Sequence, residues 1–167
     1  MTTPTREMPQ RVVDTVLRAT GAVSVGEVPG GLPAVEGTVE RRGTSWRLQV
    51  VSYPGDVLVA RSFLREAMPA DRREAAAVFA NRVNWALLVG DVEIDADDGT
   101  VRVRTALCPQ GALVSFPLVE GLLGPNLGTA ELVLPGLQAV AAGQDPKAAA
   151  DAVLDEIEAK GVDLRLD

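Results

Sequence analysis

Residues 71–107 read DRREAAAVFANRVNWALLVGDVEIDADDGTVRVRTAL and predict a helix that leads into a β-hairpin. Apolar side chains recur at helical spacing in the first half, at Ala76, Phe79, Ala80, Val83 and Leu87. In the second half they alternate, as is typical of a strand, at Val92, Ile94, Val101 and Val103. The rest of the chain supplies elements that pack around this unit.

The ends of this helix carry recognisable signals. Asp71 and Glu74 have the spacing of a capping box, so we expect the helix to begin at Asp71. Gly90 is placed to take the left-handed conformation that ends a helix. Asp98 and Gly99 tolerate positive φ and favour a tight turn between the two strands.

The remaining elements follow from patterning and from glycine and proline. We expect a helix from Pro9 to Gly21, a loop over 21–33, strands over 35–41, 45–53 and 57–64, a short helix from Ser115 to near Gly124, a helix over 126–142 that is bent or broken at Pro135, and a last helix from Pro146. The tail over 162–167 alternates and predicts either an edge strand or a frayed end.

The fold class is therefore α+β, with a five-stranded antiparallel sheet flanked by helices in the order α-β-β-β-α-β-β-α-α. With 167 residues, 47% of them apolar and 23% charged, we expect one folded domain over 1–167. Residues 1–8 are expected to be disordered, and residues 146–167 to form a C-terminal helix and tail. Neither a signal core nor a membrane-spanning run is apparent, so we expect a cytoplasmic protein.

Three segments resemble the YbjN family of bacterial sensory transduction regulators. They are SWRLQVVSY (45–53), the helix containing Asn81-Arg82-Val83-Asn84-Trp85, and GDVEIDADDGTVRVRTAL (90–107), within a similarity that spans about residues 10–143. The resemblance implies a fold like that of type III secretion chaperones, frequent homodimerisation, and a function of holding other proteins. It implies no catalytic residues.

Composition excludes several kinds of chemistry. The chain has no histidine, so it lacks Ser-His and Cys-His nucleophile pairs, and its one cysteine, Cys108, cannot form an internal disulfide. The net charge of −7 disfavours direct binding to nucleic acid and favours a basic protein partner. An EF-hand fails on spacing, because Ile94 and Ala96 would stand at ligand positions, and we predict neither a metal nor a cofactor.

The acids Asp91, Glu93 and Asp95 occupy alternate positions of one strand, opposite Val92 and Ile94, and should face solvent. They form a candidate partner-binding face. Two carboxylates in a cleft can also share acid and base work, so a carboxylate-dependent hydrolase is a third hypothesis.

Asn81 and Asn84 lie three residues apart on the helix, beside Trp85. Their amides can line a groove for a peptide backbone or small ligand. Alternatively, an asparagine on a helix near a sheet often binds the backbone of a neighbouring strand or loop. Both interpretations stay open at this point.

The region from Leu107 to Gln138 has only two ionised residues, Glu120 and Glu131, and a long apolar stripe. The candidate contacts for a dimer or partner are Leu118, Leu122, Leu132 and Leu137. The sequence thus favours a non-enzymatic chaperone-like adaptor or regulator that stabilises a partner, possible partners being nucleic-acid-binding or stress-response proteins. A small-molecule sensor, with Asn81, Asn84 and Trp85 lining its pocket, is the alternative.

Overall fold

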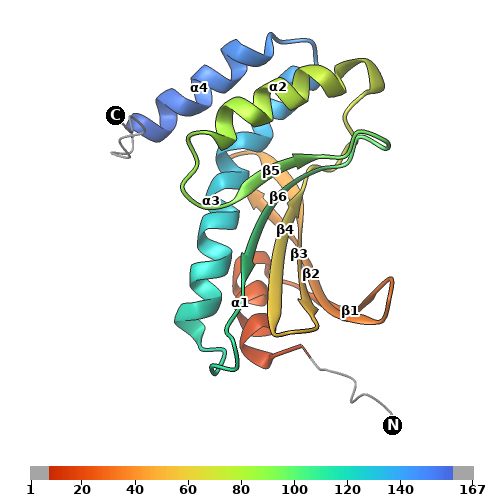
Figure 1. Cartoon of the computed structure of the whole chain (residues 1–167), viewed down its shortest axis with the longest axis vertical. Helices are drawn as coiled ribbons and strands as arrows, with labels where there is room; N and C mark the ends of the chain where they lie inside the picture. Colours follow the sequence, from red (N-terminus) through yellow and green to blue (C-terminus); the bar gives the residue numbers. More distant parts are fainter. Residues whose placement is uncertain (1–7, 160–167) are drawn as a thin grey trace.

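The computed structural model describes residues 8–159, which form helices and one antiparallel sheet of six strands (Figure 1). The helices are α1 (Gln10–Thr20), η1 (Ala70–Arg72, a 3-10 turn), α2 (Arg73–Asn84), α3 (Phe116–Ala141) and α4 (Pro146–Ala159). The strands are β1 (Ser24–Val28), β2 (Leu32–Arg41), β3 (Thr44–Tyr53), β4 (Val57–Phe63), β5 (Asp91–Ile94) and β6 (Val101–Leu107). Their order across the sheet is β1-β2-β3-β4-β6-β5, so the α+β class is confirmed.

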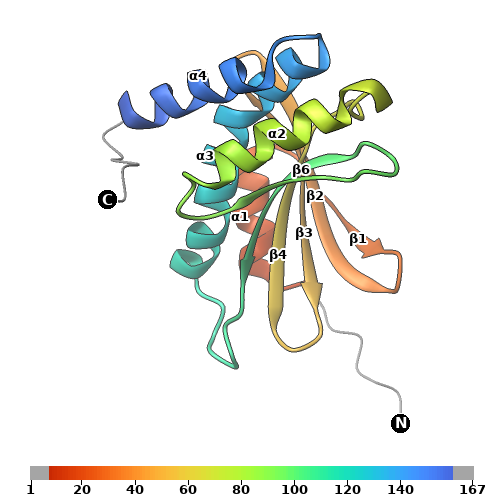
Figure 2. The same cartoon turned by 45° about the horizontal axis from the view of Figure 1, so that its top comes forward.

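The helices gather on one side of this sheet. The helices α1 and α3 pack against its strands, α2 packs against β5 and α3, and α4 packs on α2 and α3. In Figure 1, α3 runs alongside the sheet while α2 and α4 cross one end of it, and the tilted view of Figure 2 shows the same arrangement. The opposite face of the sheet carries no helix of the described part of the chain.

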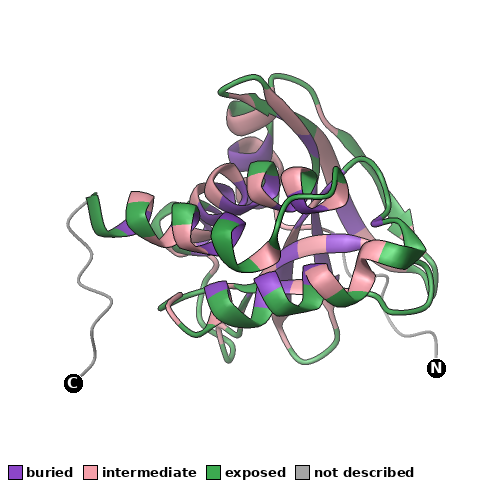
Figure 3. Cartoon of the chain, turned by 90° about the horizontal axis from the view of Figure 1, so that it is seen from above, coloured by how far each residue is buried: buried purple, intermediate pink, exposed green. Residues whose placement is uncertain are grey.

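One hydrophobic core fills the space between the sheet and the helices. The inward side chains of β3, among them Trp46, Leu48 and Val50, are fully buried. Val16 of α1, Phe79 of α2 and residues of α3 and α4 belong to the same cluster. Seen from above, buried segments line the interior while the outer side of α4 is largely exposed (Figure 3).

A buried polar link ties α3 to the sheet. The Asn126 amide nitrogen donates to the carbonyl oxygens of Ala60 (3.2 Å) and Val103 (3.0 Å). Its oxygen accepts from the Ser62 hydroxyl at 2.7 Å, and that hydroxyl accepts from Trp46 Nε1 at 3.0 Å. Every polar atom of the Asn126 side chain is thereby bonded, as burial of an amide requires.

The predicted count of five strands is wrong, because β1 was expected to be loop. Its segment is rich in glycine and proline, which weaken a central strand but are tolerated at an edge. The turn between β1 and β2 places Gly30 and Gly31 at φ +96° and +70°, in the left-handed region. The predicted meander over residues 35–64 is confirmed as β2, β3 and β4.

The helix predicted from Asp71 to Gly90 is shorter than expected. Asp71 lies in η1, no side chain caps α2, and α2 ends at Asn84, so the proposed capping box does not form. Gly90 does take positive φ (+90°), but six residues beyond the helix end. The Asn84 side chain binds the backbone of Val92, which fixes where the chain leaves the helix.

The loop of the predicted hairpin spans residues 95–100 and is longer than a tight turn, since Ile94 pairs with Val101. Gly99 has φ +79°, and a Cβ built on it would lie 2.3 Å from the carbonyl oxygen of Met68. No larger residue fits this position without a backbone shift. Glycine is therefore required by both conformation and space.

The helix α3 is continuous where a break was predicted. Pro125 and Pro135 both lie inside it, and Ser115 caps its start by accepting from the Leu118 amide at 3.4 Å. An internal proline costs a helix about 3 kcal/mol. Eleven buried residues along α3 offset that cost, so tertiary packing outweighs local propensity.

The predicted disordered segment over 1–8 and the predicted tail over 162–167 lie outside the described residues, apart from Met8. Gly21 ends α1 with φ +75°, as predicted. No helix within residues 8–159 combines the length and apolarity needed to cross a bilayer.

Candidate functional site

The sheet side without helices, called the open face below, is lined by charged and aromatic side chains. They are Glu36, Glu40, Arg47, Tyr53, Arg61, Phe63, Asp91, Glu93, Arg102 and Arg104, and the neutral Gln49 lies among them. The strand register places Glu36, Gln49, Arg61, Arg104 and Asp91 in one row across five strands. The open face thus mixes both signs of charge.

Asp91 and Glu93 lie outward, as predicted, but arginines neutralise them. Arg102 Nε and Arg104 Nε each lie 2.5 Å from a Glu93 oxygen, and Arg104 Nη2 lies 3.2 Å from Asp91. Burial alone raises the pKa of Glu93, but hydrogen bonds from Arg102 and Arg104 and their charges outweigh it and lower the pKa. The net charge of this group is therefore near zero, which weakens the argument for a basic partner.

The remaining hairpin acids organise the turn. Asp95 accepts from the backbone amides of Asp97 (2.8 Å) and Asp98 (3.3 Å). Asp98 accepts from the Thr100 amide at 2.7 Å, and this hydrogen bond lowers the pKa of Asp98. Asp95 therefore has a structural function as a turn-forming residue, although it is exposed.

The two helix asparagines have different environments. Asn84 donates to the Val92 carbonyl at 3.0 Å and accepts from the Val92 amide at 2.8 Å, so its amide pairs with β5 like a backbone group. Asn81 is exposed on α2. For Asn84 the structural interpretation is the one that the geometry supports.

Between α2 and β5 lies an apolar loop, residues 85–89, with sequence WALLV. Trp85 is 93% exposed, Leu88 76% and Val89 55%. Three large apolar side chains exposed together on a short segment are unusual for a surface that faces only water. The loop leads directly into Asp91, at the β5 edge of the open face.

The four predicted contact leucines of α3 divide into two pairs. Leu122 and Leu137 are 2% and 0% exposed and belong to the core, so they are not surface residues of this chain. Leu118 and Leu132 are half-buried. The apolar stripe is mostly core, as predicted. Large exposed apolar side chains lie in the 85–89 loop and also at Leu113 and Phe116, near the start of α3.

Arg61, in the centre of the open face, was not singled out from the sequence. Its Nη1 donates to Gln49 at 3.4 Å and its Nη2 to the Tyr53 hydroxyl at 2.5 Å. Its Nε is buried and has no hydrogen-bond partner among the described residues. The signal available in the sequence was an arginine within the apolar strand VLVARSF.

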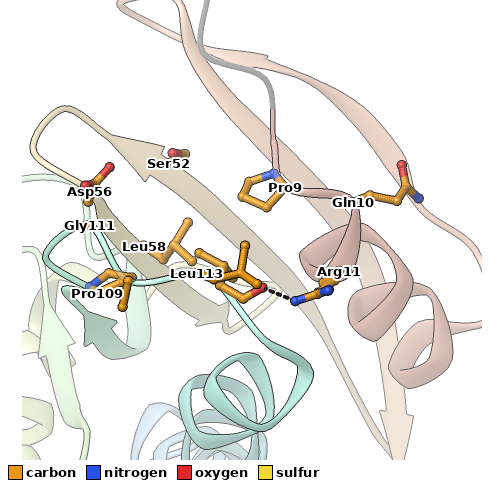
Figure 4. Close-up of a pocket in the computed structure, with 11 residues that line it drawn as sticks. Pro9, Gln10, Arg11, Ser52, Asp56, Leu58, Pro109, Gly111 and Leu113 are labelled. Atoms are coloured by element: carbon orange, nitrogen blue, oxygen red, sulfur yellow. Dashed lines mark hydrogen bonds between the residues drawn. The ribbon is translucent and has the colours of Figure 1, made fainter.

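A cavity of about 560 Å³ lies on the helix side, where the start of α1 meets the segment after β6 (Figure 4). Its walls include Pro9, Leu58, Pro109 and Leu113, and its polar groups include Arg11, Ser52 and Asp56. Arg11 donates to the Val114 carbonyl at 2.9 Å. None of Asn81, Asn84 and Trp85 lines this cavity, so this cavity is not the pocket that the sequence predicts around those three residues.

Within residues 8–159, no three cysteine or acidic side chains lie close enough together to hold a metal ion. Cys108 is exposed, 3.8 Å from the Gly55 carbonyl oxygen.

No protein-family model matches the chain, and no curated protein matches it. The similarity to YbjN proteins accordingly stays a prediction from the residues quoted above.

Proposed function

We propose that this protein is a non-enzymatic, chaperone-like adaptor or regulator that binds and stabilises a partner protein. The observation that carries the proposal is the exposed apolar loop at residues 85–89, beside an open sheet face. A partner would bury Trp85 and Leu88, and buried aromatic residues supply much of the binding energy of typical interfaces.

The order of elements supports a YbjN-like, secretion-chaperone-like fold as part of this proposal. Apart from β1, the order is helix, three strands, helix, two strands and two helices, as the patterning of the sequence predicts. The proposal includes a homodimer in the cytoplasm. Light scattering would test the dimer, because a homodimer has twice the 17.5 kDa mass of one chain.

Affinity capture from the native cell extract tests the adaptor function. We expect the wild-type bait to retain one stoichiometric partner, and the W85S/L88S double variant to lose it. Val25→Ser is the matched control, because Val25 is 57% exposed but lies on β1, at the opposite edge of the sheet. Retention of the same partner by the double variant, or a bait that captures nothing, would contradict the proposal.

The cavity beside α1 favours a second candidate, a small-molecule sensor. Its volume lies in the range of about 300–1,000 Å³ typical of ligand sites, and its mostly apolar walls carry a few polar groups. A metabolite screen by thermal shift would identify ligands that raise the melting temperature. Ala112→Trp, at an exposed position of the wall, should abolish such shifts if the ligand occupies this cavity.

A further inference from the structure

We infer that the cavity beside the start of α1 binds a small carboxylic acid with an apolar body, and that Arg11 holds its carboxylate. This inference rests on the second candidate function, the small-molecule sensor, and specifies the chemical class of its ligand. It is independent of the partner protein that the adaptor function requires.

Arg11 carries a charge that no described acid neutralises. Its side chain is half-buried in the cavity wall, and its Nη1 donates to the neutral carbonyl oxygen of Val114 at 2.9 Å (Figure 4). Within residues 8–159 it forms no ion pair, and its Nε and Nη2 have no hydrogen-bond acceptor. Both of these nitrogens keep accessible surface, unlike the enclosed Nε of Arg61. A carboxylate can therefore accept from Nε and Nη2 together while the bond to Val114 stays in place.

The start of α1 adds positive charge beside this guanidinium. No side chain caps α1, and its first turn contains no acid. The first amides of a helix have no acceptor within the helix and carry partial positive charge, which stabilises a nearby anion. Gln10 and Arg11, the first two residues of α1, both line the cavity. The helix and the guanidinium thus favour the same sign of ligand charge.

A second polar group in the cavity lacks a partner. Ser52 lies on β3, in the sheet wall of the cavity, and is only 5% exposed. Its hydroxyl forms no hydrogen bond with any residue in the described part of the chain, and an unpaired buried hydroxyl is costly. An occupant that carries a hydrogen-bonding group is therefore favoured over a pure hydrocarbon.

The rest of the cavity wall is apolar, which selects against a small polyanion such as phosphate. The apolar residues include Pro9, Leu58, Pro109 and Leu113. Leu113 is 78% exposed, so an apolar ligand would cover a large side chain that now faces water. Apolar walls with a few polar groups that fix orientation are typical of sites for small organic molecules.

The acids nearest to this site do not occupy the place of the carboxylate. Asp56 lies at the end of the cavity away from Arg11, in the turn between β3 and β4, and it takes part in another interaction (Figure 4). Asp14, one turn further along α1, accepts from the Gln10 side chain at 2.8 Å and does not line the cavity. The position in front of Arg11 Nε and Nη2 therefore stays available to a ligand.

The test compares octanoate, octanamide and octylamine, which share one apolar chain and differ in the head group. Each is titrated into the ¹⁵N-labelled full chain, and ¹H–¹⁵N spectra report binding at residues 111–114. We expect octanoate to bind at least about tenfold more tightly than the amide and the amine, because its hydrogen bonds to Arg11 are charge-assisted. Ala112→Trp should abolish the binding of octanoate.

Two arginine variants locate the carboxylate. Arg11→Gln should remove the preference for octanoate but keep the binding of octanamide, which also shows that the cavity remains intact. Arg18→Gln is the matched control, because Arg18 lies on the same helix and beside the same Phe116 ring but does not line the cavity. It should keep the preference.

Several results would overturn the inference. They are equal binding of octanoate and octanamide, an Arg11→Gln effect no larger than that of Arg18→Gln, octanoate binding that survives Ala112→Trp, and absence of octanoate binding. The metabolite screen is separate from this ligand series. A metabolite of another class whose thermal shift is lost in Ala112→Trp would leave the sensor function standing while the carboxylate site fails.

Discussion

Replacement of Asn126 by alanine should destabilise the fold strongly, because its amide joins α3 to two strands. The substitution removes two hydrogen bonds to strand carbonyls and one from Ser62, each worth about 1 kcal/mol net. It also leaves the Ser62 hydroxyl without its buried acceptor, at a cost of about 1–3 kcal/mol. We expect the free energy of unfolding to fall by about 3–5 kcal/mol, a large part of the stability of a typical domain.

Urea unfolding monitored by tryptophan fluorescence measures this loss. A Trp85→Phe background leaves the fully buried Trp46 as the reporter, and its Nε1 donates to Ser62 within the same network. In a double-mutant cycle, Ser62→Ala and Asn126→Ala should couple by about 1 kcal/mol or more. Gln138→Ala, at an exposed position of α3, should change the stability by no more than about 0.5 kcal/mol. A loss below about 1 kcal/mol for Asn126→Ala would refute the assigned function of the network.

Three further perturbations test local features of the fold. Gly99→Ala should lower the free energy of unfolding by about 2 kcal/mol or more in urea titrations, because the new Cβ meets the Met68 carbonyl at positive φ. Glu93→Gln should lower the free energy of unfolding by up to about 1 kcal/mol at pH 7. Since the pKa of Glu93 is lowered in the folded state, its ionised form stabilises the fold at pH values above the ordinary pKa of a glutamate. The difference in free energy of unfolding between wild type and Glu93→Gln should therefore vanish as the pH falls through the folded-state pKa. Asp145→Ala removes the acceptor of the Ala148 amide at the start of α4. It should lower the free energy of unfolding by about 1 kcal/mol, which thermal unfolding would show as a lower melting temperature.

Local patterns predicted the elements whose signals agree with their tertiary environment. The alternation in SWRLQVVSY predicted β3, whose Trp46, Leu48 and Val50 point inward. Gly21 ends α1 because it follows the last apolar residues of the helix and takes the left-handed conformation. Such elements need no information from distant parts of the chain.

The errors arose where distant contacts override a local preference. The strand β1 forms despite Gly26 and Pro29 because the edge of β2 offers it a partner along five residues. Pro125 and Pro135 remain inside α3 because the helix buries one face over its whole length. The composition and spacing of residues reveal neither the pairing partner of β1 nor the buried face of α3.

The candidate site shows the same limit for side chains. The sequence predicted backbone binding as one alternative for Asn84, and the structure shows it. Asn126 binds strand carbonyls in the same way. Nothing in the local sequence distinguishes these two residues from Asn81, which is exposed. Exposure of the WALLV loop could not be inferred, because helical spacing placed Leu87 and its neighbours in a longer α2. Tertiary contacts, rather than residue type, decide which amide is structural and which apolar side chain is exposed.

Charge gives the clearest case of a property that depends on register. The net charge of −7 does not show which charges are paired, whereas the pairing of β5 with β6 sets Asp91 and Glu93 beside arginines. A shift of one residue would separate these pairs and place the arginines on the opposite face. Net charge governs the long-range field, which acts over a Debye length of about 8 Å at physiological salt, while contact within the open face depends on single pairs.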